Sequence, residues 1–360
     1  MSWFLAFAGF ALLVILHELG HFTAAKAVGM RVERFSLFFP PLLARKKIGE
    51  TEYAIGAVPL GGYVKISGMN PDENLPDEVR TRAYWSQKPW KRIVVIAAGP
   101  AVNLVIAIVL LVLFFWLIGP NSVTREVTSI DKSFPANGKL HLHDRIIAVD
   151  GHARGPKHLG ELVRTHKCAQ RPPVKRCQAV TPATVLIERN GQRMILRVKP
   201  VYDPGAKFTR LGFGFDDRGP RHTEPLGPAI SDAANRFGYV TTQTLALPAR
   251  LFNPQQRKQI SSTVGAYEVT RQTILDDTSN VIPILAIISL SLAIINLFPF
   301  LPLDGGHIFW AVVEKVRGRP IPFSVMERSG VVGFALIFMI FLIGLSNDIG
   351  RITGNGFQVR

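Results

Sequence analysis

Residues 3–25 read WFLAFAGFALLVILHELGHFTAA, an apolar run whose only ionisable residues are His17, Glu18 and His21. Residues four positions apart share one face of a helix, so both imidazoles can reach a single metal ion while Glu18 lies beside it. This spacing is typical of zinc hydrolases, in which the glutamate is the general base. Ionisable groups in a membrane span are costly and usually mark a functional site. The alternatives are a chance motif or a buried polar cluster that joins helices.

Three further apolar runs predict a polytopic α-helical membrane protein with four transmembrane helices. They cover Ile93–Ile118, Val281–Leu303 and Val331–Leu345, and the last is long enough only if its flanks are included. A cleaved signal peptide is the competing interpretation of the first run. That run has no basic start, and cleavage would remove the metal motif, so we reject this alternative.

The net charge of +16 helps to predict the membrane topology of the chain but does not indicate a particular class of partner. We find no nucleic-acid-binding motif, and the basic residues are spread over loops, so no nucleic-acid partner is expected. Basic residues follow the first run and fill the connection between the third and fourth. Positive flanks face the cytoplasm, which predicts that both termini and the long middle segment are exported.

These patterns divide the chain into successive parts. The predicted order is a transmembrane helix at 1–25, a cytoplasmic or membrane-associated β-hairpin region at 26–92, a second transmembrane helix at 93–118, a soluble α/β module at 121–203, a linker with an amphipathic helix at 204–280, a third transmembrane helix at 281–303, a cytoplasmic loop at 304–329, a fourth transmembrane helix at 330–346 and an exported tail at 347–360. The amphipathic helix is expected to lie on the module or on the bilayer surface. Cys168 and Cys177 are the only cysteines, and they predict a disulfide in the exported module, with two free thiols as the alternative.

The third run ends in NLFPFLPLDGG, residues 296–306. Pro299 and Pro302 break helical hydrogen bonding, which a bilayer tolerates only where protein or a water-filled cavity covers the freed groups. Asp304 is a candidate third zinc ligand, because a catalytic site generally needs three protein ligands and the first run supplies two. A plain Asp-Gly turn at the membrane edge is the alternative.

The segment Tyr53–Ile66 alternates loosely around a Pro-Leu-Gly-Gly turn, which predicts a hairpin. The edge of this hairpin can receive an extended substrate strand. The candidate substrate-binding residues are therefore Tyr53, Gly61, Gly62, Tyr63 and Val64. A scaffold that only shapes the cavity explains the hairpin equally well. Asn103, in the second run, is a candidate for contact with substrate or for a hydrogen bond between helices.

Five stretches of the chain resemble the site-2 protease family of intramembrane zinc metalloproteases, and among them the bacterial regulator-of-sigma-E protease group: HELGH at 17–21, PLGGYV at 59–64, AGPAVN at 98–103, residues 296–306 and Asn347-Asp348. The resemblance implies that His17, His21 and Asp304 bind Zn²⁺, that Glu18 is the base, and that Asn296 is catalytic through a hydrogen bond to the substrate or the developing oxyanion. Residues 123–201 resemble a circularly permuted PDZ domain, so one periplasmic PDZ-like domain is expected.

The same resemblance implies a function, a cellular location and a class of substrate. The expected reaction is hydrolysis of peptide bonds within transmembrane segments of single-span membrane proteins, of the anti-sigma-factor or remnant-signal-peptide type. The expected place is a bacterial inner membrane, in regulated intramembrane proteolysis, with the lipid bilayer as a permanent partner. Two other functions are considered, a non-catalytic scaffold that binds partners through the PDZ-like module and a metal transporter. A transporter would need more polar residues in the second and fourth runs.

Overall fold

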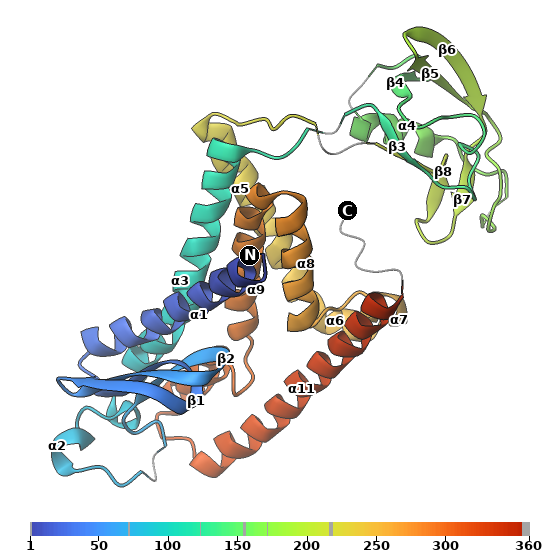
Figure 1. The fold of residues 1–360 in the computed structure, drawn as a ribbon. Coiled ribbons are helices and arrows are strands. Elements are labelled where there is room, and N and C mark those ends of the chain that lie inside the picture. Colours follow the sequence, from blue (N-terminus) through green and yellow to red (C-terminus); the bar gives the residue numbers. More distant parts are fainter. Residues whose placement is uncertain are drawn as a thin grey trace. The chain divides into compact units, whose positions relative to one another are not determined.

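The computed structural model describes residues 2–70, 73–122, 124–153, 156–170, 172–215 and 219–354, which form two compact units (Figure 1). Unit 1 comprises Met1–Leu117 and Glu224–Arg360, and unit 2 comprises Ile118–Thr223. All the residues predicted to bind metal or substrate lie in unit 1.

Four helices of unit 1 are long and apolar enough to cross a membrane. They are α1 (Ser2–Ala27), α3 (Pro89–Leu113) with the π-helical turn η2 (Phe114–Ile118) that continues it, α9 (Val281–Asn296) with the 3-10 turn η3 (Thr278–Asn280) that precedes it, and α11 (Phe323–Thr353). Their number within the described part of the chain agrees with the four predicted spans.

The third and fourth apolar helices begin or end at residues other than those predicted from the sequence. The third, α9, ends at Asn296 instead of residue 303, because Pro299 and Pro302 cannot continue the helical hydrogen bonds. A new helix, α10 (Asp304–Arg317), then occupies part of the segment predicted as a loop. The fourth helix extends beyond 330–346 on both sides, since its polar flanks contain good helix formers such as Met326 and Glu327.

Helix α3 is the common packing partner of the helices around the predicted site. It packs against α1, α9 and α10. Small side chains permit the close approach to α9, since Ala107 of α3 and both Ala286 and Ala293 of α9 are fully buried. This packing fixes α1, α9 and α10, which carry the predicted site residues, to one common helix.

The predicted amphipathic helix is α5 (Leu226–Leu245). Its apolar face, with Ala233, Phe237 and Val240, packs against α3 and α9. The expectation that it lies on the soluble module or along the bilayer surface is therefore wrong, because its apolar stripe is buried against the transmembrane helices. Shorter helices complete unit 1: α2 (Asp77–Arg80), η1 (Tyr84–Ser86), α6 (Leu247–Leu251), α7 (Pro254–Arg257), α8 (Thr263–Asp276) and η3 (Thr278–Asn280).

Strands β1 (Val32–Ile48) and β2 (Thr51–Ile66) form one bent sheet in the predicted hairpin region. Residues 32–37 lie in its middle, because they pair with 62–66 on one side and with 52–55 on the other. Residues 42–48 pair with 51–56 and form the second outer segment. Among the described residues, each of the two outer segments, 62–66 and 42–48, has one edge without a strand partner.

Unit 2 is an α/β module with its own buried core. Its elements are β3 (Val127–Ile130), β4 (Arg145–Val149), α4 (Pro156–Thr165), β5 (Ala183–Arg189), β6 (Gln192–Val198), β7 (Val201–Asp203), β8 (Phe208–Arg210) and β9 (Phe213–Phe215). Asn190 and Gly191, both with positive φ, make the predicted turn between β5 and β6. The predicted disulfide between Cys168 and Cys177 is present.

The module is longer than predicted. Residues 204–215 were assigned to a linker, but β8 pairs with β7 and β9 pairs with β3. Leu211 and Phe213 pack in the core of the module. Strands of three residues in a Gly- and Pro-rich stretch show no period, so the sequence pattern missed them.

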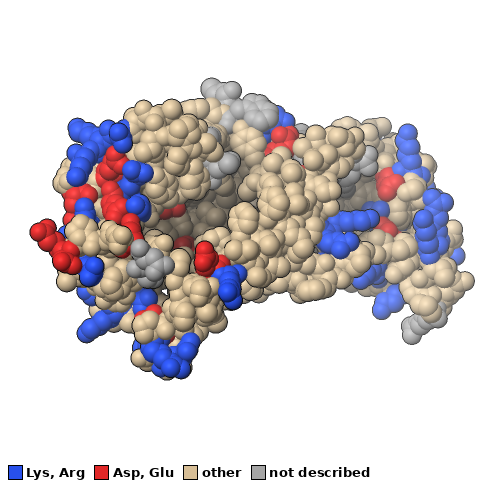
Figure 2. All heavy atoms as spheres, turned by 90° about the horizontal axis from the view of Figure 1, so that it is seen from below, with Lys and Arg blue, Asp and Glu red and all other residues tan. Residues whose placement is uncertain are grey.

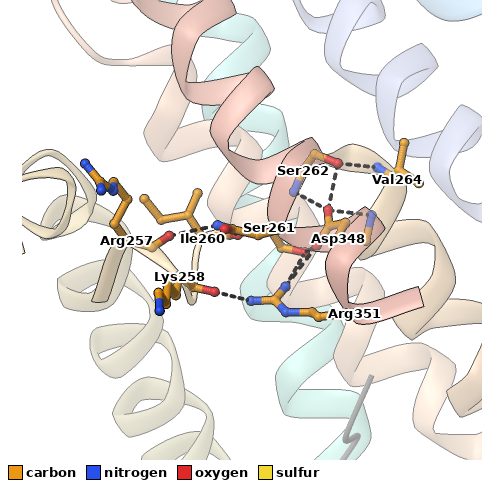
Figure 3. A network of polar contacts seen from close by, with 10 residues as sticks. Arg257, Lys258, Ile260, Ser261, Ser262, Val264, Asp348 and Arg351 are labelled. Atoms are coloured by element: carbon orange, nitrogen blue, oxygen red, sulfur yellow. Dashed lines mark hydrogen bonds and ion pairs between the residues drawn. The ribbon is translucent and has the colours of Figure 1, made fainter. Parts of the chain in front are cut away.

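The C-terminal part of α11 is bound to the segment before α8 through one buried carboxylate (Figure 3). Asp348, which is fully buried, accepts hydrogen bonds from the Ser261 hydroxyl, from the Ser262 hydroxyl and backbone N–H, and from the Gly265 N–H, at 2.7–3.1 Å. Arg351, one turn later, donates to the same carboxylate at 2.9 Å. A buried charge with this many donors stabilises the fold only while all of them are present.

Replacing Asp348 with asparagine is expected to lower the free energy of unfolding by about 3 kcal/mol, because the substitution breaks a buried ion pair and turns acceptor positions into donors. Thermal melting of the full chain in detergent would measure this. Glu327→Gln is the matched control, since it removes the same charge from an exposed position of α11. Equal melting temperatures for the two variants would contradict a structural role for Asp348.

Candidate metal and catalytic site

Three predicted ligand atoms converge between two helices of unit 1. His17 and His21 lie one turn apart on α1, and their Nε2 atoms are 3.2 Å apart. Asp304, the first residue of α10, places Oδ2 at 3.3 Å from His17 Nε2 and 3.4 Å from His21 Nε2. Within the described residues this is the group of three or more His, Cys, Asp and Glu side chains that is close enough to hold a metal ion.

The spacing of these atoms fits zinc. Ligand atoms at about 2.0–2.1 Å from a tetrahedral zinc ion lie about 3.3–3.4 Å from one another. The Asp304 Oδ2 atom is buried and has no hydrogen-bond partner, although it points at two imidazole nitrogens. Burial alone would raise the pKa of Asp304, but the two imidazoles lower it to about 2, so the carboxylate is ionised at neutral pH. A buried anion and two imidazole nitrogens at these distances are a suitable donor set for a divalent cation.

Helix α3 orients both imidazoles. His21 Nδ1 donates to the backbone carbonyl of Val95 at 2.9 Å, which leaves the Nε2 lone pair for a metal ion. On the other imidazole, Nδ1 lies 3.3 Å from the Asn103 amide. Asn103 Oδ1 has no other partner, so it can accept a hydrogen bond from His17 Nδ1–H once the amide is turned over.

Gly99 of α3 lies directly beside the His21 ring. A Cβ atom at residue 99 would lie 2.2 Å from His21 Nε2 and 2.6 Å from Cε1. In the sequence, Gly99 was part of a stretch that carries the family resemblance, and no role was assigned to it. The structure adds that the missing side chain makes room for a ligand.

Gly99→Ala is expected to displace the His21 ring and to weaken zinc binding by at least about tenfold, the lower end of the effect of removing an outer-shell partner. The zinc content of purified protein after dialysis against graded zinc buffers would measure this. The control is Gly238→Ala on α5, where an added methyl group meets nothing within 4 Å. Unchanged zinc affinity in Gly99→Ala would show that His21 has space to move.

The three ligands open into a cavity of about 350 Å³. Besides them, its lining includes Glu18, Asn296, Tyr63 and Val64. Glu18 makes no hydrogen bond to another described residue, so its carboxylate remains available inside the cavity. The Asn296 amide lies 3.4 Å from His17 Nε2, at the last residue of α9. The structure thus brings the predicted base and the predicted amide donor beside the ligands.

Other residues predicted to contact substrate lie elsewhere. Tyr53 packs against Phe22 and Phe35 and does not line this cavity. Asn103 is fully buried under His17, so its position supports a role in orienting the ligand instead of contact with substrate. Gly61 lies near α1 outside the cavity, whereas Gly62 lies next to Glu18, and a Cβ atom there would be 3.0 Å from Glu18 Cγ.

The sequence interpretation missed two features of this site. His307 was not among the predicted site residues, but it lines the cavity one turn after Asp304. Burial lowers the pKa of His307, so this imidazole is neutral at pH 7. Arg92 of α3 forms a largely buried ion pair with Glu314 of α10 at 2.5 Å, which fixes the helix that carries Asp304. Local spacing shows no signal for a contact between residues this far apart in the chain.

Glycines let the chain reverse just before Asp304. A Cβ atom on Gly305 would lie 2.2 Å from the Leu297 carbonyl oxygen, and one on Gly306 would lie 2.4 Å from the Leu301 backbone nitrogen. The loop after α9 therefore folds directly onto the start of α10. This reversal brings Asp304 close to the two histidines.

The sequence of this chain is similar to those of known proteins. The model of Peptidase family M50 matches residues 5–340. A provisionally named zinc metalloprotease of Nostoc is 29% identical over 98% of this chain and 97% of its own length, and one of Rhizobium meliloti is 30% identical over 95% of each chain. The solved PDZ domain of an SdrC-like protein of Listeria monocytogenes is 16% identical, covers 28% of this chain and 93% of its own, and has a TM-score of 0.21. Since the family model covers nearly the whole sequence, the chain belongs to peptidase family M50.

Proposed function

We propose that this zinc metalloprotease hydrolyses peptide bonds within, or at the edge of, the transmembrane segments of single-span membrane proteins. The observation that supports this most directly is the position of the metal site. His17, Glu18 and His21 all lie in the apolar span Ala6–Ala27, so a substrate bond has to reach a depth where soluble loops do not lie.

The residues of the cavity have separate roles in the proposed reaction. Zinc, when bound by His17, His21 and Asp304, supplies a Lewis acid that activates water and polarises the carbonyl of the bond to be cleaved. Glu18 accepts a proton from the attacking water and later delivers it to the leaving amine. The Asn296 amide lies beside the ligands, where it can donate to the substrate carbonyl as negative charge develops on the oxygen.

The outer segment 62–66 of the sheet is the proposed docking edge for an unwound substrate. It pairs with β1 on one side only, and Tyr63, Val64 and Ile66 line the catalytic cavity. A substrate helix hides its amides in internal hydrogen bonds, and pairing with this edge would replace those bonds while the strand is extended. The edge therefore offers backbone groups at the place where a peptide bond must be exposed.

Val64→Pro is expected to lower kcat/KM by at least about tenfold, because proline removes a backbone donor and distorts the edge. Val64→Thr, which keeps the backbone and the branched shape, should cost little. Zinc content and melting temperature, measured on both variants, report whether the site itself is intact. Similar losses in the two variants would show that the side chain matters instead of the backbone.

The test of the proposed function is cleavage by the purified full-length protein of candidate single-span substrates, with fragments mapped by mass spectrometry. We expect cuts inside or beside the apolar stretch of the substrate, loss of cleavage with a chelator, and recovery when zinc is added. Cuts confined to soluble loops would contradict an intramembrane reaction.

The proposed place of this reaction is a bacterial inner membrane, with both termini and unit 2 on the periplasmic side, and the proposed substrates are anti-sigma factors or remnant signal peptides in regulated intramembrane proteolysis. The disulfide between Cys168 and Cys177 supports this orientation, since such bonds persist in oxidising compartments. The same unit is the proposed PDZ-like domain. Protease added to spheroplasts should cleave unit 2. Full protection of unit 2 from this protease would indicate the opposite orientation in the membrane.

A further inference from the structure

The sheet of unit 1 carries a second groove, about 310 Å³ in volume, that does not belong to the catalytic site. Two rows of side chains cross the sheet on one face and form its floor: Phe35, Tyr53 and Lys46 in the first row, and Leu37, Ile55 and Ala44 in the second. Ile55 is 45% exposed and Tyr53 is 36% exposed. An apolar floor is thus open along the outer segment 42–48.

Contacts with Phe22 of α1 indicate where this groove lies along the length of an apolar span. Its ring centroid is 5.3 Å from that of Phe35 and 5.9 Å from that of Tyr53. Phe22 belongs to the span Ala6–Ala27 and lies about 7 Å from its end, at about 1.5 Å per residue. The groove is therefore at the level where acyl chains meet headgroups.

Three consecutive basic residues, Arg45, Lys46 and Lys47, are exposed on the outer segment, and Arg45 and Lys46 line the groove. Arg45 is 3.8 Å from Glu52, and neither lysine has an ion pair among the described residues. Two other basic residues of the sheet, in contrast, bind carboxylates at 2.6–2.7 Å: Arg34 with Glu52, and Lys65 with Glu33. In Figure 2 charged side chains gather over this end of unit 1, next to a wide surface without them.

Leu43 and Ile48, at the two ends of the basic triplet, are 71% and 58% exposed. Large exposed apolar side chains beside unpaired cations are unfavourable in water, but both groups are satisfied by an amphiphile with an anionic head. The outer segment therefore combines cationic groups, an apolar floor and a position at the membrane interface.

We infer that this groove binds an anionic phospholipid. Arg45 and Lys46 contact the phosphate, and one acyl chain lies over Leu37 and Ile55. Such a lipid would hold the outer segment 42–48 at the bilayer surface. The inference does not depend on the proposed reaction, because none of these residues lines the catalytic cavity.

The test uses the full chain in nanodiscs and fluorescent phosphatidylglycerol, with phosphatidylcholine as the neutral comparison. We expect retention of phosphatidylglycerol at least about tenfold above phosphatidylcholine, and a loss of about 25-fold in Arg45→Gln/Lys46→Gln, at roughly fivefold for each basic residue. Ala44→Trp should fill the groove and displace the lipid without changing the charge, and Ile55→Trp provides a second variant in the same row in case the first fails to fold. Lys315→Gln/Arg317→Gln removes two exposed charges from the end of α10 and should have no effect.

The variants separate the groove from general surface attraction. If the Arg45→Gln/Lys46→Gln variant loses lipid and both tryptophan variants retain it, the basic residues attract anionic lipid without a groove, and the inference fails. It also fails if the α10 control loses as much lipid as the Arg45→Gln/Lys46→Gln variant, or if the wild type shows no preference for phosphatidylglycerol.

Discussion

Replacing Glu18 with glutamine is expected to lower turnover by about 10²–10⁴-fold while zinc content stays unchanged. The amide keeps the size of the side chain but cannot accept a proton from water, and none of the three ligand atoms is altered. Glu18 lines the cavity without a hydrogen bond to another described residue, so the substitution removes no contact of the fold. Single-turnover kinetics on a mapped substrate, with zinc measured on the same sample, would test this.

Two outcomes would remove Glu18 from its proposed role. Turnover near the wild-type level would show that another group is the base. Loss of zinc together with activity would indicate that Glu18 supports the metal instead of moving a proton. Glu327→Gln, at an exposed position of α11, is the control for the change in charge.

Asp304→Asn is expected to weaken zinc binding by more than about 100-fold, the upper end of the effect of losing an outer-shell partner. The amide is a neutral and weaker ligand, and it replaces the carboxylate whose Oδ2 lies 3.3–3.4 Å from both imidazole nitrogens. Activity should fall with zinc occupancy and should return in part when zinc is supplied in excess. The Glu18 variant should not respond to added zinc, so the two substitutions are distinguished by one titration.

Asp77→Asn is the control for Asp304→Asn, because the Asp77 side chain is 93% exposed in a short helix outside the site. Normal zinc content in purified Asp304→Asn would contradict the proposed ligand set. The third ligand would then have to come from another residue, and the convergence of the three atoms would have no role in metal binding.

Features encoded by short-range spacing were predicted well from the sequence. The four apolar helices follow from local composition, and the placement of His17 and His21 on one helical face follows from their separation of four residues. The family, the peptidase activity and the dependence on zinc, all predicted from the motifs, are confirmed by the family match. Asp304 was expected as third ligand because the first run supplies only two, but its close approach to the histidines depends on the reversal of the chain after α9.

What the sequence did not show depends on contacts between distant segments. No periodicity indicates that Gly99 makes room for His21, that Arg92 pairs with Glu314, or that α5 packs on transmembrane helices. The end of the module was missed because its last strands are only three residues long and pair with distant partners. The roles of individual cavity residues stay predictions until the variants are measured.

Helix α3 holds the site from one stripe of its surface, through Arg92, Val95, Gly99 and Asn103, which recur every three or four residues. None of these four residues lines the catalytic cavity. A genetic screen for inactive protein would therefore return positions at helical intervals on a helix that supplies no metal ligand. An inhibitor that displaced this helix would inactivate the peptidase without competing with the substrate.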